Sequence, residues 1–251
     1  MVTASLPLLL VNQPIMTENL DFIGKGHNRK PCIVIPDDEK EYAFDKEQFL
    51  VPSHYKGDIK NIMLPHGLMM DRIEKLAMDI YEHYGDQELH IICILKGSRG
   101  FFSALIEVLN RIRRYSAGAG YQNPPYIEHY VRLKSYSGME STGKVQIMAD
   151  DLSTLHGKHV LVVEDIVDTG RSLSYFCRSL LQYKPASVMI ATLLEKRTPK
   201  SIGFKADFVC FEIPDAFAVG FSLDFNEYFR DLNHLAVLDP VAIDKYRVAE
   251  P

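Results

Sequence analysis

The chain has 251 residues, of which 47% are hydrophobic and 24% are charged, and these proportions predict one globular domain with a large core rather than a disordered chain. A formal net charge of -5 gives no general attraction to nucleic acids or anionic membranes, so the sequence predicts neither as a partner. The apolar run at residues 6–11 is too short to span a membrane and no basic region precedes it, so we expect a cytoplasmic protein.

The spacing of cysteines and histidines does not indicate a metal centre. The four cysteines lie far apart, mostly inside apolar runs, and form no CxxC pair; they are Cys32, Cys93, Cys177 and Cys210. No two histidines have HExxH spacing. We therefore expect reduced thiols in the core and no zinc site.

The first thirty residues differ from the rest, because a polar and basic stretch follows the apolar run. We expect residues 1–30 to form a poorly ordered N-terminal extension, and the alternative that translation starts at Met16 stays open. The globular domain is expected to cover residues 31–251.

A long helix is predicted after Pro65. Apolar residues recur on one side of it at helical spacing, at Met69, Ile73, Leu76, Ala77 and Ile80. Charged residues fall on the other side, at Asp71, Arg72, Glu74 and Lys75. Gly85 ends the helix, and the apolar residues 90–95 then predict a buried strand.

The turn at residues 96–100 carries Lys96, Gly97 and Arg99 between this strand and a second predicted helix. Such a turn can bind an anion, because the free backbone N–H groups and the dipole of a helix N-terminus favour negative charge. A solvated connection is the alternative, and the turn alone does not exclude it.

Residues 111–125 are polar and predict a surface connection before a strand at 126–134. The next segment, 135–145, is rich in small and hydroxyl side chains and begins with Ser135 and Tyr136. This composition predicts a mobile hairpin loop, for which ordinary loop polarity is a sufficient explanation.

The segment 158–183 carries the strongest functional signal. Its apolar residues 160–163 predict a strand buried on both faces, which ends at Glu164 and Asp165. A turn rich in polar groups follows and leads into a helix; it consists of Asp168, Thr169, Gly170, Arg171 and Ser172.

This turn can present backbone N–H groups to a phosphate. The three acids in and before the turn, Glu164, Asp165 and Asp168, would nevertheless repel a bare phosphate. Their presence indicates a divalent cation, a ribose diol or a proton to be removed, and therefore phosphorylated sugar chemistry. For each acid taken singly, helix capping or solvation at a strand end is the alternative. The three acids and the turn, taken together, favour a functional site over helix capping or solvation.

Further strands are predicted at 187–194 and 207–212. The alternation of strands and helices predicts an α/β fold, with a mostly parallel sheet flanked by helices and a small hood from N-terminal residues and the chain from about residue 200 onward. Lys196 and Phe217 follow these two strands, at the sheet edge where such folds bind ligands. The alternatives are that Lys196 is a solvated surface charge and that Phe217 is a core residue.

The run VVEDIVDTGRS at 162–172 resembles the phosphoribosyl pyrophosphate signature of type I phosphoribosyltransferases. Three later runs resemble the hypoxanthine-guanine branch of that family: LLEKRTP, FEIPDAFAVGFSLDF and NEYFRDLNH. The likeness extends over about residues 31–248.

The resemblance implies transfer of a phosphoribosyl group from Mg²⁺-bound phosphoribosyl pyrophosphate to N9 of hypoxanthine or guanine, with release of pyrophosphate. It implies that Asp168 is the general base and that Lys196 binds the purine O6. Glu164 and Asp165 would hold the ribose hydroxyls and Mg²⁺, with Asp224 as a further metal contact.

The resemblance also implies the remaining substrate contacts. The backbone of Lys96 and Gly97 would bind the diphosphate, with a cis peptide after Leu95 and with Arg230 completing the clamp. The other implied contacts are Ser135 and Tyr136 on a closing loop, Thr169, Gly170, Arg171 and Ser172 around the 5′-phosphate, and Phe217, Ala218 and Asp224 at the purine. Ile166 is a further implied substrate contact.

The sequence departs from the usual family pattern at Ser98 and Arg99, where a glycine and an aromatic residue are usual, and at Ala218, where valine is usual. These departures leave one alternative open, a catalytically weak nucleotide-sensing or RNA-binding regulator on the same fold. The family is commonly dimeric or tetrameric, so we expect a homodimer or homotetramer. The sequence decides neither the oligomeric state nor whether xanthine is a substrate.

Overall fold

An eight-stranded sheet forms the centre of the protein, which a computed structural model describes over residues 8–9, 23–26, 29–116, 126–135, 145–149 and 151–247. The strand order is β1-β6-β5-β4-β7-β8-β9-β2. The strands are β1 (Leu8–Leu9), β2 (Ile33–Val34), β4 (Leu89–Leu95), β5 (Ile127–Ser135), β6 (Val145–Ala149), β7 (His159–Val167), β8 (Ser187–Lys196) and β9 (Phe208–Ile213). Neighbours from β5 across to β2 pair in parallel, whereas β6 and β1 pair antiparallel. This confirms the predicted α/β fold with a mostly parallel sheet.

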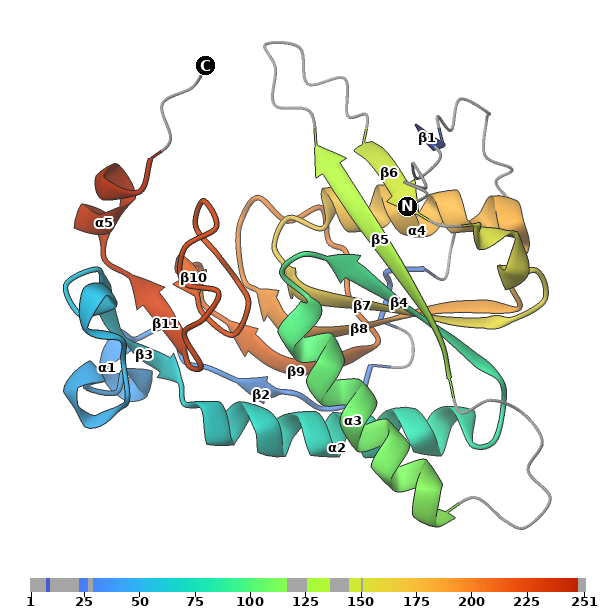
Figure 1. The fold of residues 1–251 in the computed structure, drawn as a ribbon, viewed down its shortest axis with the longest axis horizontal. Helices are drawn as coiled ribbons and strands as arrows, with labels where there is room; N and C mark the ends of the chain where they lie inside the picture. Colours follow the sequence, from blue (N-terminus) through green and yellow to red (C-terminus); the bar gives the residue numbers. More distant parts are fainter. Residues whose placement is uncertain are drawn as a thin grey trace, which may run out of the picture.

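Helices cover both faces of this sheet (Figure 1). On one face, α2 (His66–Tyr84) and α3 (Arg99–Ser116) share an apolar core with the strands, and on the other face α4 (Arg171–Leu180) packs into a second core. The five apolar positions predicted for α2 are all buried, and Gly85 ends the helix with a φ of 55°. Within the described ranges, no helix is both long and apolar enough to cross a membrane.

Arg72 of α2 is buried, so the prediction that it lies on the solvent side of this helix is wrong. Its guanidinium donates to the carbonyl oxygens of Pro31, Val209 and Cys210 at 2.7, 3.0 and 3.2 Å. These acceptors lie 41, 137 and 138 residues away in the sequence, so helical spacing could not reveal them. Three charged hydrogen bonds offset the cost of burying the cation.

Replacing Arg72 with methionine is expected to lower the free energy of unfolding by about 2–4 kcal/mol, because the buried carbonyls of Val209 and Cys210 would each lose a donor, at a cost of about 1–3 kcal/mol each. Chemical denaturation followed by circular dichroism measures this loss. Arg111→Met is the control, since Arg111 lies exposed on α3 and pairs with Glu74 at the surface. A loss at Arg72 no larger than that at Arg111 would show that the three carbonyls do not need this donor.

Strand β7 continues beyond its apolar residues. Glu164, Ile166 and Val167 all pair in register with β8, so the prediction that this strand ends at the two acids is wrong. A parallel neighbour satisfies the backbone groups of both strands, and pairing therefore persists where the side chains become polar. The acids consequently lie within a hydrogen-bonded strand, two and three residues before its end.

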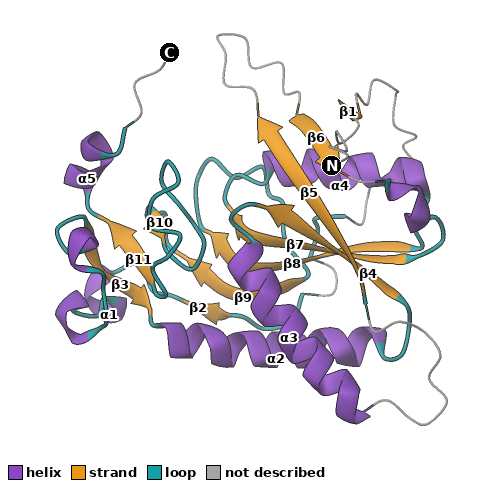
Figure 2. Ribbon diagram, in the orientation of Figure 1, coloured by secondary structure: helices purple, strands orange, loops and turns teal. Residues whose placement is uncertain are grey.

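A second, three-stranded sheet forms the hood at one end of the main sheet (Figure 2). It is antiparallel, in the order β10 (Ala218–Val219), β11 (Leu235–Leu238) and β3 (Ile59–Leu64), with α1 (Glu39–Tyr42) and α5 (Pro240–Lys245) nearby. The predicted start of the hood near residue 200 is wrong, because β9 pairs with β8 and β2 in the main sheet. Single-turn 3₁₀ helices occur at Lys46–Gln48, Ser53–Tyr55, Leu152–Leu155 and Leu181–Tyr183.

The described residues before Pro31 contact the main sheet. Arg29 forms ion pairs with Glu195 and Glu212 at 2.7 and 2.9 Å. Most of residues 1–30 lie outside the described part of the chain, so the boundary between extension and domain stays a prediction.

The four cysteines are free thiols, as predicted, and three of them are buried: Cys93, Cys177 and Cys210. Burial raises the pKa of each of these three thiols, because the charged thiolate is disfavoured away from water. They therefore act as core residues.

Candidate active site

The ends of three strands meet at the carboxyl edge of the main sheet. Strands β4, β7 and β8 are parallel neighbours, so the residues at their carboxyl ends lie side by side. Lys96 and Gly97 follow β4, Asp168 follows β7, and Lys196 ends β8. Open parallel sheets bind their ligands at this edge. The topology thus brings together residues that are far apart in the sequence.

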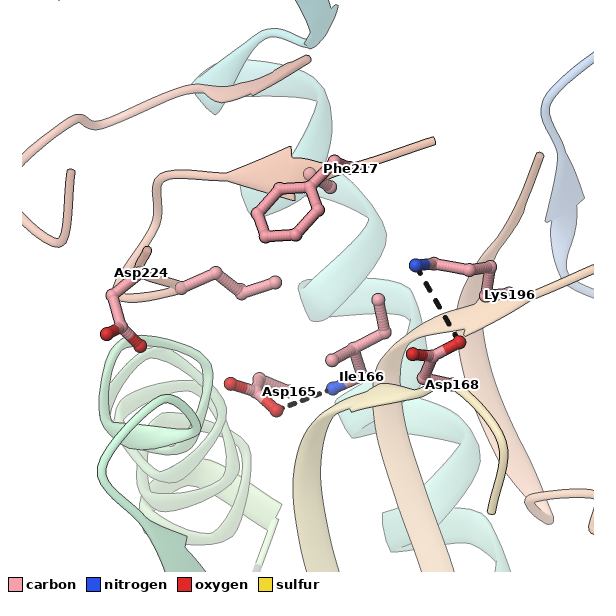
Figure 3. Close-up of a pocket in the computed structure, with 8 residues that line it drawn as sticks. Asp165, Ile166, Asp168, Lys196, Phe217 and Asp224 are labelled. Atoms are coloured by element: carbon pink, nitrogen blue, oxygen red, sulfur yellow. Dashed lines mark hydrogen bonds and ion pairs between the residues drawn. The ribbon is translucent and has the colours of Figure 1, made fainter. Parts of the chain in front are cut away.

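An open cavity of about 230 Å³ lies at this edge (Figure 3). The residues that line it are Asp165, Ile166, Asp168, Lys196, Phe217, Ala218, Leu223 and Asp224. All of these except Leu223 belong to the predicted substrate-binding set. Lys196 and Asp168 lie together at one end, and Asp165 and Asp224 lie toward the other.

Lys196 is held between two carboxylates. Its side chain is 12% exposed, and its Nζ lies 3.7 Å from Asp168 Oδ1 and 3.8 Å from Asp215 Oδ1. Thr198 Oγ1 donates to the other oxygen of Asp215 at 3.1 Å. Both ion-pair distances exceed that of a hydrogen bond, so Nζ is held by charge while its N–H groups can still donate to a ligand. A carbonyl oxygen of a ligand can accept a hydrogen bond from these N–H groups.

Phe217 presents aromatic surface to the cavity. It is 45% exposed, and its ring contacts Phe225 in an edge-on arrangement, with centroids 5.3 Å apart and planes at 81°. Its carbonyl oxygen accepts a hydrogen bond from Leu238 N at 2.9 Å, which ties it to β11. A ring held in this way keeps surface for stacking on a planar ligand. Ala218 begins β10 beside it.

The surroundings of Glu164 and Asp165 disfavour two negative charges. Burial, and then the charge of Asp165, raises the pKa of Glu164 well above its ordinary value. Burial also raises the pKa of Asp165 to about 6, although Ile166 N donates to its Oδ1 at 2.7 Å. Glu164 Oε2 is a buried oxygen for which the described residues provide no hydrogen-bond partner.

These two carboxylates fit a divalent cation such as Mg²⁺. Hard oxygen ligands suit this ion, and its charge would offset the cost of burying both acids. The Glu164 oxygen without a hydrogen-bond partner would be available as a ligand atom.

Asp224, the further predicted metal contact, faces other partners. Its Oδ1 pairs with Arg230 at 2.8 Å, and its Oδ2 accepts from Glu227 N at 2.8 Å. In the described part of the chain, no three His, Cys, Asp or Glu side chains are grouped to hold a metal. The structure therefore does not bring Asp224 together with Glu164 and Asp165 as one ligand set.

The turn after β4 fits closely against Asp165. The peptide bond between Leu95 and Lys96 is cis, as the resemblance implies. A Cβ at Gly97 would overlap Asp165 Oδ2, so a larger residue would displace the acid. Ser98 is buried, and its Oγ accepts a hydrogen bond from Asp165 N at 3.0 Å. The serine that departs from the usual family pattern therefore joins this turn to β7.

Close packing and a backbone hydrogen bond hold the turn after β7 in place. Gly170 precedes α4 with a φ of 78°, and a Cβ there would lie 2.5 Å from Phe204 Cβ. Thr169 O accepts a hydrogen bond from Ile202 N at 3.0 Å. Arg171 and the next residue, Ser172, are exposed at the start of α4. This arrangement leaves a helix N-terminus open toward solvent, where an anion can bind.

Arg230 is fixed near the turn after β4. Its Nη1 donates to Ser222 O at 2.8 Å, and its Nη2 pairs with Asp224 at 2.8 Å. Glu227 connects it to Lys96 through ion pairs of 3.3 and 3.1 Å. Cations from two separate loops thus lie on either side of one carboxylate.

The predicted loop residues Ser135 and Tyr136 are not placed in the site. Ser135 is the last residue of β5, where only its backbone is described, and Tyr136 lies outside the described residues. Their role stays a prediction.

The local sequence pattern assigns no role in the site to three residues that the structure places there. Leu223 lines the cavity, Ser98 bonds to Asp165, and Glu227 bridges Lys96 and Arg230. Ser98 and Asp165 are 67 residues apart, and Glu227 and Lys96 are 131 apart. Neither periodicity nor motif spacing detects contacts of this range.

Known proteins are similar in sequence to this chain over most of its length. A family model described as a phosphoribosyl transferase domain matches residues 61–226. The hypoxanthine-guanine-xanthine phosphoribosyltransferase of Plasmodium falciparum is 49% identical over 224 residues, which cover 89% of this chain and 95% of that protein. The hypoxanthine-guanine phosphoribosyltransferase of Homo sapiens is 46% identical over 220 residues, with coverage of 87% and 98%.

A solved structure extends the likeness to the fold. The crystal structure of hypoxanthine-guanine phosphoribosyltransferase from Schistosoma mansoni in complex with IMP matches with a TM-score of 0.71 at 32% identity, over 87% of this chain and 100% of that one. These relatives are named as transferases, so the alternative of a regulator gains no support. The chain belongs to the hypoxanthine-guanine phosphoribosyltransferases, a family of transferase enzymes.

Proposed function

We propose that this enzyme transfers the 5-phosphoribosyl group from phosphoribosyl pyrophosphate to N9 of hypoxanthine or guanine, giving IMP or GMP and pyrophosphate. The observation that carries the proposal is the pair of Lys196 and Asp168, whose charged groups lie 3.7 Å apart at one end of the cavity. A 6-oxopurine needs a donor at O6 and a proton acceptor at its ring N–H. This pair supplies both groups side by side.

Lys196 would select purines that carry an oxygen at C6. Its ammonium group donates to that oxygen, whereas the amino group of adenine offers hydrogen atoms at the same place and leaves the lysine without an acceptor. Phe217 would stack on the ring plane and so fix the base in the orientation that Lys196 reads.

Asp168 would act as the general base. As the new bond forms, the purine ring loses a proton, and a carboxylate next to the ring edge can accept it. The ion pair with Lys196 keeps that carboxylate at the base end of the cavity.

The other end of the cavity would bind the departing diphosphate. Glu164 and Asp165 would hold Mg²⁺, whose charge stabilises the negative charge that develops on the leaving group. The backbone at Lys96 and the Arg230 guanidinium would bind the diphosphate, and residues 169–172 would bind the 5′-phosphate through the start of α4. We also propose a cytoplasmic homodimer or homotetramer; light scattering of the purified protein distinguishes these assemblies from a monomer.

The test is nucleotide formation from phosphoribosyl pyrophosphate and Mg²⁺, with hypoxanthine, guanine, xanthine and adenine compared under one set of conditions. Product is expected with hypoxanthine and guanine and not with adenine. The xanthine rate settles a question that the sequence leaves open. Failure to form nucleotide from every purine would overturn the proposal.

Replacing Lys196 with methionine is expected to lower kcat/KM for hypoxanthine about 10- to 100-fold, since a hydrogen bond from a charged donor contributes about 1.5–3 kcal/mol. The KM for phosphoribosyl pyrophosphate should change less than about threefold, because the diphosphate binds at the other end of the cavity. Steady-state kinetics with each substrate varied in turn measure both. Lys200→Met, at an exposed position four residues on, is the control. An equal rise in both KM values would contradict a purine-specific role.

A further inference from the structure

A tight turn places Glu227 beside the cations at the diphosphate end. Phe225 and Tyr228 exchange backbone hydrogen bonds of 3.2 and 3.1 Å, and between them Asn226 and Glu227 have φ values of 51° and 72°. Positive φ at both central positions is typical of a type I′ turn, which favours glycine at the second of them. A glutamate in this conformation is strained.

The Glu227 carboxylate binds two cations from different loops. Its oxygens lie 3.1 and 3.2 Å from Lys96 Nζ and 3.3 Å from both Nε and Nη2 of Arg230. The side chain is 62% exposed, so a soluble anion can reach the same cations. A strained residue whose side chain makes such contacts is a candidate for a functional role.

Arg230 does not depend on Glu227 for its position. Ser222 O and Asp224 Oδ1 each bind the guanidinium at 2.8 Å, so Glu227 can leave while Arg230 stays in place. Two cations, Lys96 and Arg230, face two carboxylates, Asp224 and Glu227. These four ion-paired groups therefore sum to no net formal charge while Glu227 is in contact with the two cations, and displacement of Glu227 leaves them with one positive charge more.

We propose that Glu227 is an internal competitor of the diphosphate, which occupies the anion site between Lys96 and Arg230 and is displaced when pyrophosphate or the diphosphate of the substrate binds. This inference rests on the proposed function, which assigns the backbone at Lys96 and the Arg230 guanidinium to the diphosphate, and it adds the Lys96 ammonium group to that site. A diphosphate offers more charge and more oxygen atoms to the two cations than one carboxylate does, so it prevails. The competition weakens the binding of released pyrophosphate and so favours its departure.

The test is the affinity of the purified protein for inorganic pyrophosphate with Mg²⁺, measured by titration calorimetry without purine. Glu227→Gln retains the shape of the side chain and removes its charge. We expect the Kd for pyrophosphate to fall about three- to tenfold, as befits the loss of exposed ion pairs to two cations. Glu82→Gln, exposed on α2, makes the same change in net charge away from the site and should leave this Kd unaltered.

Glu227→Gly is a second variant that guards against a folding defect, because glycine is the residue that this turn favours. It should bind pyrophosphate at least as tightly as the glutamine variant. Unchanged or weaker binding in both variants would overturn the inference, and so would a wild-type protein that binds no pyrophosphate. Nucleotide formation from hypoxanthine, measured on the same wild-type preparation, decides the proposed function separately.

Discussion

Replacement of Asp168 with asparagine is expected to lower kcat for IMP formation about 10²- to 10⁴-fold, the range that general base catalysis contributes. Asparagine keeps the size of the side chain and can still face Lys196, but a neutral amide is too weak a base to accept the purine proton. The Kd for IMP is expected to rise less than about fivefold. Steady-state rates at saturating substrates give kcat, and titration of the protein with IMP gives Kd.

Asp215→Asn is the matched control for this variant. Asp215 also lies beside Lys196, at 3.8 Å compared with 3.7 Å for Asp168, and its side chain is similarly exposed. Asp215→Asn therefore measures how much kcat falls when Lys196 loses one negatively charged neighbour, and we expect this fall to be less than about tenfold. Equal losses of kcat in the two variants would show that Asp168 acts on Lys196 and is not the base.

Gly97→Ala is expected to lower kcat about 100-fold or more while the protein remains folded. A Cβ at this position would overlap Asp165 Oδ2, so the carboxylate or the turn must shift. A shift of about 1 Å in a catalytic group can cost about 10²-fold in rate. Initial rates over a range of Mg²⁺ concentrations measure the loss, and circular dichroism checks the fold.

The control for Gly97→Ala is Gly67→Ala in the first turn of α2. A Cβ at Gly67 meets no atom within 4 Å, and alanine favours a helix, so both rate and stability should be retained. If Gly97→Ala keeps a rate within about threefold of the wild-type protein, then the position of Asp165 is not critical for turnover.

Local patterns in the sequence predicted the main elements correctly where one buried face dictates the spacing. The apolar positions of α2 all face one core, and the continuous apolar runs of β4 and β8 reflect burial on both faces of a parallel sheet. The predictions were wrong where a contact with residues distant in the sequence determines the length of a strand or the burial of a side chain. Strand β7 is longer than its apolar run because β8 pairs with it, and Arg72 is buried because three distant carbonyls accept its hydrogen bonds.

The candidate site was predicted mainly through resemblance to a family. Taken alone, Lys196 has the sequence signature of a solvated charge, and it becomes a donor to the cavity only because β8 ends beside β7. Ser98 appeared in the sequence as a departure from the family pattern, whereas its hydroxyl group holds the backbone of Asp165. Glu227 lies in the run NEYFRDLNH, but no pattern gave it a role, because its contact with Lys96 depends on another strand.

The close fit of Gly97 and Ser98 against Asp165 bears on the conformational entropy of binding. Separate surface loops that become ordered around a ligand lose conformational freedom at that moment, and this loss weakens the complex. Here the Ser98 hydrogen bond and the tight contact at Gly97 join the ends of β4 and β7 when the chain folds. A ligand that reaches this edge therefore meets groups already in place, and less of its binding free energy is offset by ordering the protein.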